Sequence, residues 1–286
     1  MANLKELRVR IASVQSTMQI TSAMKMVSAA KLKRAQDAIQ QMRPYAEKLR
    51  EILSNISASL EGTEGQYSTE RPVRRVLLVA ITSNRGLCGA FNANVLKMAR
   101  RQAEEYRQRG VEVDILAIGR KGADFFKKSG TVVGNHSELF DGLGFDKVAE
   151  VAAEIMQWYV EERYDKVMLC YNRFKNAGVQ ELTYEEFLPV KIEVTAGVQN
   201  NEYLFEPSRA EILEDLIPNA LKTQLFKSLL DSVAAEHGAR MTAMHKATDN
   251  ANELQKGLKL DYNKARQAAI TNEILEIVGG AEALNG

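Results

Sequence analysis

Apolar residues recur at alternating spacings of three and four near the N-terminus of this chain. This rhythm is the heptad seam of a helix that packs along another helix. Pro44 interrupts the pattern, but the spacing resumes beyond it, so we expect the helix to kink there without ending. The seam positions are Leu4, Leu7, Ile11, Val14 and Met18, followed after the proline by Ala46, Leu49, Leu53, Ile56 and Leu60.

A second run of this kind fills the chain from residue 208 onward. We expect Pro218 to bend this helix, and we expect a phase slip in its seam near residue 254. The seam carries Leu221, Leu225, Leu229, Val233, Met241, Met244, Thr248 and Ala251, and beyond the slip Leu254, Leu258, Tyr262, Ala265 and Ala269.

The middle of the chain has a different pattern, of short apolar runs separated by helical stretches. Three runs rich in branched residues indicate buried strands, and alternation within 179–194 indicates one or two antiparallel strands at the sheet edge. Strands that alternate with helices favour an α/β domain with a largely parallel sheet. The expected strands are 75–82, 111–118 and 166–171, and the expected helices are 91–108 and 146–163.

The lengths of the terminal helices limit the architecture. At 1.5 Å per residue, helices over residues 3–58 and 219–278 would reach about 80 and about 90 Å. A compact globule of this chain length is only about 50 Å across, so both helices must pair and project from it. We therefore predict an antiparallel coiled coil, formed by residues 1–62 and 208–286, with a Rossmann-like α/β domain inserted at residues 73–206.

Charge and cysteine content exclude several classes of protein. The first 60 residues carry ten Lys and Arg and four acids, a charge of +6, whereas the whole chain sums to +1. The two cysteines are too few for a disulfide framework or a zinc site, which favours a reducing intracellular compartment. No apolar run approaches the roughly 20 residues that span a bilayer, and no secretory signal is present. Any membrane association should therefore come through a partner.

The segment SNRGLCGAFN (83–92) places glycines between a strand and a helix, as phosphate-binding turns do. Its spacing matches neither the dinucleotide fingerprint nor the P-loop, so we interpret it, and GRKG (119–122), as tight turns. Cys88 could be a nucleophile at a helix N-terminus, but the three histidines fall in unrelated segments. We therefore expect an idle thiol, no catalytic set, no cofactor and no metal.

ITSNRGLCG (81–89) resembles a stretch of F-type ATP synthase γ subunits, and residues 10–36, 239–251 and 262–284 are similar to the first and last helices of that family. The resemblance implies a non-catalytic rotor shaft, whose coiled coil occupies the centre of a hexamer of α and β subunits. Its globular domain would stand on the membrane c-ring beside the ε subunit, at the cytoplasmic face of the inner membrane. Nothing here resembles the regulatory cysteine loop of chloroplast members, so thiol switching is not expected.

The resemblance also implies contact residues on the long helices. A basic patch would meet acidic loops of the β subunits, although an ordinary solvated face is the alternative. Arg266 and Gln267 would touch the β subunit's catch loop, or else lie on ordinary surface. The basic patch consists of Met24, Lys25, Lys31, Lys33 and Arg34.

Two further segments are assigned in the same way. Ile274 and Ile277 belong to an apolar tail that would sit in a socket of the hexamer, whereas the alternative is a coiled-coil end capped by Gly279 and Gly280. Tyr203, Phe205 and Glu206 would lie near polar loops of the rotor ring, or would pack at a strand end.

Two rival functions stay open at this stage. The first is a coiled-coil scaffold with a basic interaction helix that binds nucleic acid, although no aromatic residues are interleaved with the basic ones. The second is a nucleotide-using α/β enzyme with a helical oligomerisation arm. Specific binding of ATP or NAD by the purified chain would favour the enzyme.

Overall fold

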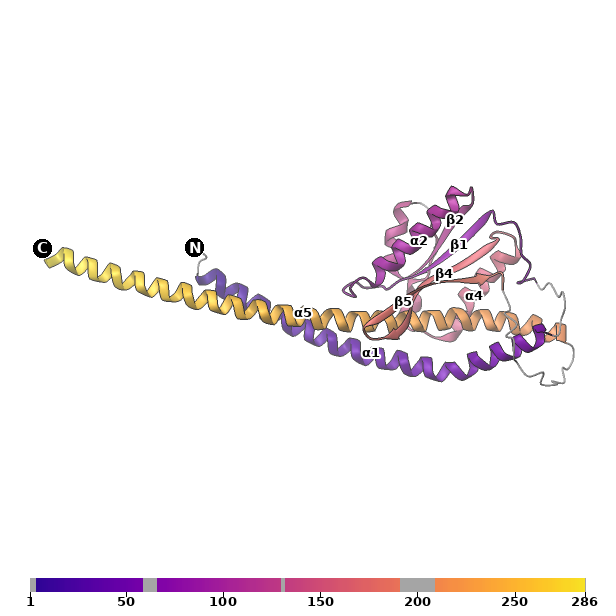
Figure 1. Ribbon diagram of the computed structural model, residues 1–286, viewed down its shortest axis with the longest axis horizontal. Helices are drawn as coiled ribbons and strands as arrows, with labels where there is room; N and C mark the ends of the chain where they lie inside the picture. The colour runs from indigo at the N-terminus through magenta and orange to yellow at the C-terminus, as the bar shows by residue number, and fades with distance from the viewer. Residues whose placement is uncertain (1–3, 59–65, 130–131, 191–208, 286) are drawn as a thin grey trace. The chain divides into compact units, whose positions relative to one another are not determined.

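The computed structural model describes residues 4–58, 66–129, 132–190 and 209–285 (Figure 1). The chain forms two compact units: a helical unit, residues 1–28 with 241–286, and an α/β unit, residues 29–240. The terminal helices α1 (Leu4–Ala58) and α5 (Arg209–Asn285) each contribute to both units. Both run through their prolines, Pro44 and Pro218, as the sequence predicted.

The α/β unit contains a five-stranded sheet in the order β3-β2-β1-β4-β5. Strand β1 pairs in parallel with β2 and β4, and β2 pairs in parallel with β3. At the other edge β5 runs antiparallel to β4, which confirms the expected antiparallel edge strand. The strands are β1 (Arg75–Ile81), β2 (Glu112–Ile118), β3 (Val132–Asn135), β4 (Lys166–Asn176) and β5 (Val179–Leu188).

Two of the connecting helices lie where the sequence placed them: α2 (Phe91–Gln108) and α4 (Phe145–Val160). The sequence pattern missed α3 (Arg120–Phe126), strand β3 and the 3-10 turns Lys127–Ser129 and Ser137–Asp141. Helix α3 has seven residues and β3 has four, so neither is long enough to show a period.

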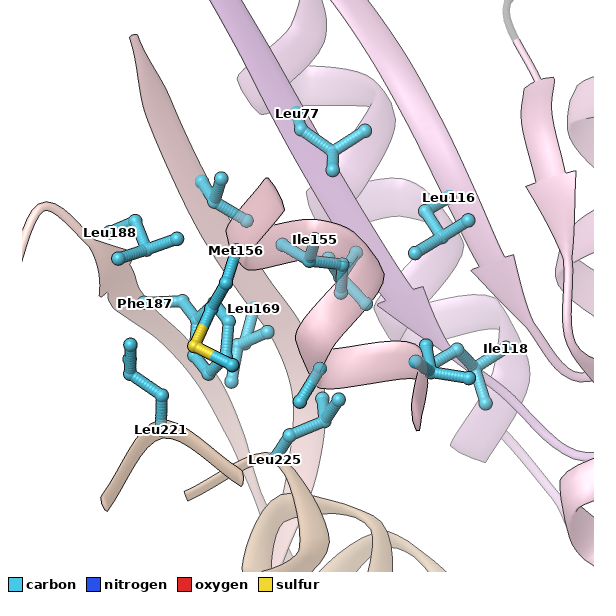
Figure 2. Packing of buried hydrophobic residues seen from close by; sticks show 14 of the residues in the cluster. Leu77, Leu116, Ile118, Ile155, Met156, Leu169, Phe187, Leu188, Leu221 and Leu225 are labelled. Carbon is cyan, nitrogen blue, oxygen red and sulfur yellow. The ribbon is translucent and has the colours of Figure 1, made fainter. Parts of the chain in front are cut away.

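Alternate residues of β1 point to opposite faces of the sheet, and each face has its own core. Leu77, Val79 and Ile81 pack with α4 and α5, whereas Val76, Leu78 and Ala80 pack with α2. In Figure 2, Leu221 and Leu225 of α5 point toward Leu169 and Phe187 of the sheet and Met156 of α4. Ile52 and Leu53 of α1 pack against the same core. The predicted fold class, paired terminal helices with an inserted α/β domain, is thus confirmed.

The expected domain boundaries at residues 62, 73, 206 and 208 stay predictions, and three of them (62, 206 and 208) lie within 59–65 and 191–208, outside the described residues. Across the part of the chain that the structure describes, no helix is both long enough and apolar enough to cross a membrane.

Candidate functional site

Three side-chain pairs fix how α1 and α5 run in the helical unit. Arg8 Nη2 donates to Tyr262 Oη at 2.7 Å, the hydroxyls of Thr21 and Thr248 lie 2.8 Å apart, and Lys25 Nζ lies 3.3 Å from His245 Nδ1. Residue numbers rise along α1 while they fall along α5, and each pair adds to 269 or 270. The two helices are therefore antiparallel in a constant register.

The seam of α5 continues without the predicted phase slip, so that prediction is wrong. Leu254, expected on the seam, is 55% exposed, and Gln255 is buried in its place at 8%. With Gln255 included, the seam positions from Met241 to Ala269 keep the three-and-four spacing throughout. A polar residue at a seam position hid the continuity, because the sequence pattern counted only apolar residues.

The basic patch predicted on α1 is divided by the structure. Met24 and Lys25 are half-buried at the seam, and Lys25 lies beside His245. Lys31, Lys33 and Arg34 are exposed, and the Nζ of Lys33 pairs with Asp37 at 2.8 Å. The three exposed cations present charge to solvent, whereas Lys25 contacts the partner helix. Their predicted contact with acidic loops stays a prediction.

The predicted contacts at the C-terminal end of α5 are all exposed. Arg266 and Gln267 face solvent, and Ile274 and Ile277 are 54% and 72% exposed. The register explains this exposure: α1 begins at Leu4, which faces a position near Arg266, so no described α1 residue faces those beyond. The described residues from Thr271 to Ala281 are accordingly all exposed.

Helix α5 continues through Gly279 and Gly280, so the alternative of a helix end capped by these glycines is wrong. The apolar tail is therefore a helix with an unpaired surface, and contiguous apolar surface of this kind marks an interaction site. The predicted contacts Tyr203, Phe205 and Glu206 lie outside the described residues.

The crevice in which doubly wound sheets bind nucleotides is filled by the chain itself. Strand β1 is followed along the chain by β2 on one side of it, whereas β4 is followed by β5 on the other side, which makes the carboxyl ends of β1 and β4 the switch point of the sheet. Cys88 and Phe91, which follow β1, pack there against Ala235 and Ala239 of α5. The four side chains are at most 9% exposed, so no room is left for a nucleotide at this point.

A buried ion pair fastens α5 to the turn after β1. Arg240 Nη1 lies 2.6 Å from Glu236 Oε1, and the two side chains are only 10% and 11% exposed. The Arg240 guanidinium also donates to the backbone oxygens of Arg85 and Gly86 at 3.1 and 3.2 Å. Burial raises the pKa of Glu236, while Arg240 opposes that shift by favouring the carboxylate. The turn is thus a docking point for α5.

The geometry of the same turn agrees with a structural role. Leu87 and Gly89 have φ of 62° and 59°, the left-handed region that a tight reversal needs. Gly119 has φ of 110°, and a Cβ there would lie 2.1 Å from the backbone oxygen of Thr82. Both glycine-rich segments are therefore tight turns, as the sequence predicted.

Neither thiol has the properties of a nucleophile. Cys88 and Cys170 are 1% and 0% exposed, and burial raises the pKa of both, that of Cys170 to about 12. Among the described residues no group of three His, Cys, Asp or Glu is arranged to hold a metal ion. The contacts around the turn after β1 therefore pack the sheet and dock α5.

Sequence reasoning missed Glu236 and Arg240, which are the most deeply buried charged pair described on α5. Their spacing of four is the usual spacing of an exposed helix ion pair, so charge pattern alone did not separate them from surface. The one available signal was Gly238 between them: a Cβ at this position would lie 3.2 Å from Ala177 Cα, which marks a close approach.

Comparisons with known proteins agree along the whole chain. The family model described as ATP synthase matches residues 3–284. The chain is 62% identical over 290 residues to the ATP synthase gamma chain of Flavobacterium johnsoniae, with all of both chains covered. It is similar to a chain in the central stalk and c-ring structure of Tetrahymena thermophila mitochondrial ATP synthase, with 26% identity, a TM-score of 0.60, and 80% of this chain and 99% of that one covered.

A chain of Euglena gracilis mitochondrial ATP synthase has the same fold, with a TM-score of 0.72 and 22% identity. That match covers 98% of the present chain and 94% of the other.

Proposed function

Because the chain belongs to the family of ATP synthase gamma chains, we propose that its paired helices form the shaft that couples rotation of the membrane c-ring to the α and β subunits. As a gamma chain it is a non-catalytic subunit of the central stalk of an F-type ATP synthase complex. The shaft couples distant sites by favouring a different conformation in each β subunit as it turns.

The observation that carries the proposal is the extension of α5 beyond its partner helix. Ile270, Ile274, Leu275, Ile277 and Val278 are 48–72% exposed on a stretch that α1 does not cover. Such a surface requires an apolar socket, which the centre of a ring of α and β subunits would supply. The exposed Lys31, Lys33 and Arg34 would meet acidic loops of the β subunits, and Arg266 with Gln267 would meet a further loop.

The remaining partners follow from the same proposal. The α/β unit would stand on the c-ring beside the ε subunit, with the segment that holds Tyr203, Phe205 and Glu206 near polar loops of the ring. The chain would then be held at the cytoplasmic face of the inner membrane through the complex, without insertion of its own helices. The closed switch-point crevice supports the non-catalytic role, because the residues that could have held a nucleotide hold α5.

Co-expression with α and β subunits tests the proposal. We expect a purified complex that contains one copy of this chain for several copies of each partner, and no ATPase activity of the chain alone. Equal stoichiometry of the three chains, or hydrolysis by the pure chain, would contradict it.

A truncation tests the role of the tail. Removal of residues 270–286 should leave the circular dichroism and thermal unfolding of the α/β unit unchanged, because none of those residues belongs to that unit. The same truncation should weaken retention of the chain in the co-purified complex. Loss of α/β structure on truncation, or unchanged retention, would count against the socket.

A further inference from the structure

Helices α2 and α3 cover one face of the sheet and leave a groove of about 690 Å³ between them. Its floor is apolar: Ala103, Ile115 and Phe126 line it, and each is at most 3% exposed. One stripe of α2 and the short helix α3 form its walls. This groove is separate from the switch-point crevice, which α5 fills.

The two segments that flank the groove are strongly basic as a whole, and four cations and two acids line the groove itself. Residues 91–109 and 119–128 carry nine Lys and Arg and three acids, a charge of +6 in a chain whose total is +1. All nine cationic residues are exposed. Two of the acids already pair with α2 arginines, Glu104 with Arg100 and Glu105 with Arg101, at 3.6 and 3.5 Å. The unbalanced charge therefore comes from the remaining cations, among which Arg107, Lys121 and Lys128 line the groove.

An exposed aromatic ring lies in the same wall. Phe125 lines the groove and is 42% exposed, and its ring stands edge-on to the buried Phe126 at 4.9 Å between centroids. Exposed Phe125 extends the apolar floor toward solvent, inside a rim of positive charge. An apolar floor, an aromatic ring and basic walls along an 18-residue helix match the features that receive a helix in a groove.

We propose that the groove between α2 and α3 binds an acidic amphipathic helix of a partner protein. The apolar stripe of that helix packs on Leu96 and Phe125, the accessible apolar side chains that line the groove, and its flanking carboxylates lie against Arg107, Lys121 and Lys128. A flat anionic bilayer reaches the rim but does not enter the hollow between α2 and α3. A nucleic-acid backbone pairs with the cations of the rim but has no apolar group to pack against Phe125. The shape therefore favours a helix.

Fluorescence anisotropy on the full chain tests this inference. The probe is a fluorescein-labelled designed helix as long as α2, 18 residues, with Leu at the i, i+3, i+4 and i+7 positions and Glu elsewhere. A second probe carries Lys in place of every Glu. We expect saturable binding of the acidic probe that weakens between about 50 and about 200 mM salt, and no binding of the basic probe. The outcome of the rotor tests above does not bear on this result.

Matched variants locate the binding. The double substitution Lys121→Glu with Lys128→Glu should weaken binding of the acidic probe about tenfold. Phe125→Ser should weaken it by a similar factor, because it removes the exposed ring. Lys147→Glu is the control: Lys147 is an exposed cation of α4, which packs on the opposite face of the sheet, and its reversal should leave the affinity unchanged.

Three results would overturn the inference. The first is no saturable binding, or equal binding of the two probes. The second is that the groove variants bind like the Lys147 control. The third is displacement of the acidic probe by phosphatidylglycerol vesicles or single-stranded RNA, with loss of that binding in the groove variants, because it would assign the surface to a membrane or to nucleic acid.

Discussion

The hydroxyl oxygens of Thr21 on α1 and Thr248 on α5 lie 2.8 Å apart in the seam between the two helices. Each hydroxyl also lies within hydrogen-bond distance of a carbonyl of its own helix, Met18 at 3.1 Å and Met244 at 2.8 Å. Thr21 is only 8% exposed, so water does not readily replace a lost partner there. This pair fixes the register at which the helices meet.

Replacing one threonine should therefore cost more than replacing both. Thr21→Val should lower the free energy of unfolding by about 1 kcal/mol, because it removes the hydroxyl that Thr248 faces. The double substitution with Thr248→Val should recover part of that loss. A double-mutant cycle by thermal unfolding measures the coupling. Strictly additive losses would show that the two hydroxyls do not interact.

The Arg240–Glu236 pair should be a major contributor to the docking of α5. Arg240→Ala leaves a buried carboxylate without its partner and removes the bonds to Arg85 and Gly86, so a loss of about 3–5 kcal/mol is expected in urea unfolding of the full chain. Lys246→Ala, at an exposed position on the same helix, should change stability by less than about 0.5 kcal/mol. Equal effects of the two substitutions would refute the docking role.

Two glycines of α5 should respond in opposite ways to alanine. A Cβ at Gly257 would have no neighbour within 4 Å, so Gly257→Ala should stabilise the helix by about 0.5–1 kcal/mol. At Gly238 a Cβ would lie 3.2 and 3.3 Å from the Cα and backbone oxygen of Ala177, and Gly238→Ala should be destabilising. Thermal unfolding of both variants decides this. Stabilisation at both sites would show that α5 does not need the close approach.

His237 makes stability depend on pH. Burial, with Arg240 and Lys31 nearby, lowers its pKa from 6.5 to about 4. The unfolded chain takes up this proton below about pH 6.5, whereas the folded chain does not, so stability present above pH 6.5 is lost as the pH falls toward 4. His237→Gln should remove this loss.

Comparing the His237→Gln variant with wild type isolates the effect of His237 on stability, because Asp231 gives stability the opposite pH dependence. Burial raises the pKa of Asp231 from 3.8 to about 6, so its contribution falls as the pH rises through that window. Urea unfolding of both proteins at a series of pH values between about 4 and about 7 gives the difference. Parallel curves for wild type and His237→Gln would show that His237 does not titrate as described.

The sequence predicted elements whose signal is local and repeated. The terminal helices rest on a three-and-four spacing and the strands β1, β2 and β4 on apolar runs, and the structure has these elements. Gln255 shows the limit of that method, since a polar residue in a seam position reads as a break in the pattern. The sequence pattern therefore assigned the neighbouring apolar residue, Leu254, to the seam, whereas Leu254 is exposed in the structure.

The candidate sites were less predictable because they depend on tertiary packing. Whether Lys25 or Lys31 faces solvent depends on the angle at which the two helices meet, and the charge sequence of α1 does not contain that angle. The basic character of the segments that flank the α2–α3 groove was not recognised, because acidic residues elsewhere in the chain cancel their positive charge in the total of +1. The charge pattern of α5 does not distinguish Arg240 from a surface residue. Its burial depends on the turn after β1, which packs against it in the fold.

Rotation of this chain inside the complex can be tested by site-directed labelling. Cys88 and Cys170 are buried, so a thiol-reactive bead linker should attach to Lys147→Cys, an exposed position of the α/β unit. With the catalytic hexamer fixed to a surface and ATP supplied, we expect sustained rotation of the bead in one direction. A bead that stays still while the same complexes hydrolyse ATP would contradict it.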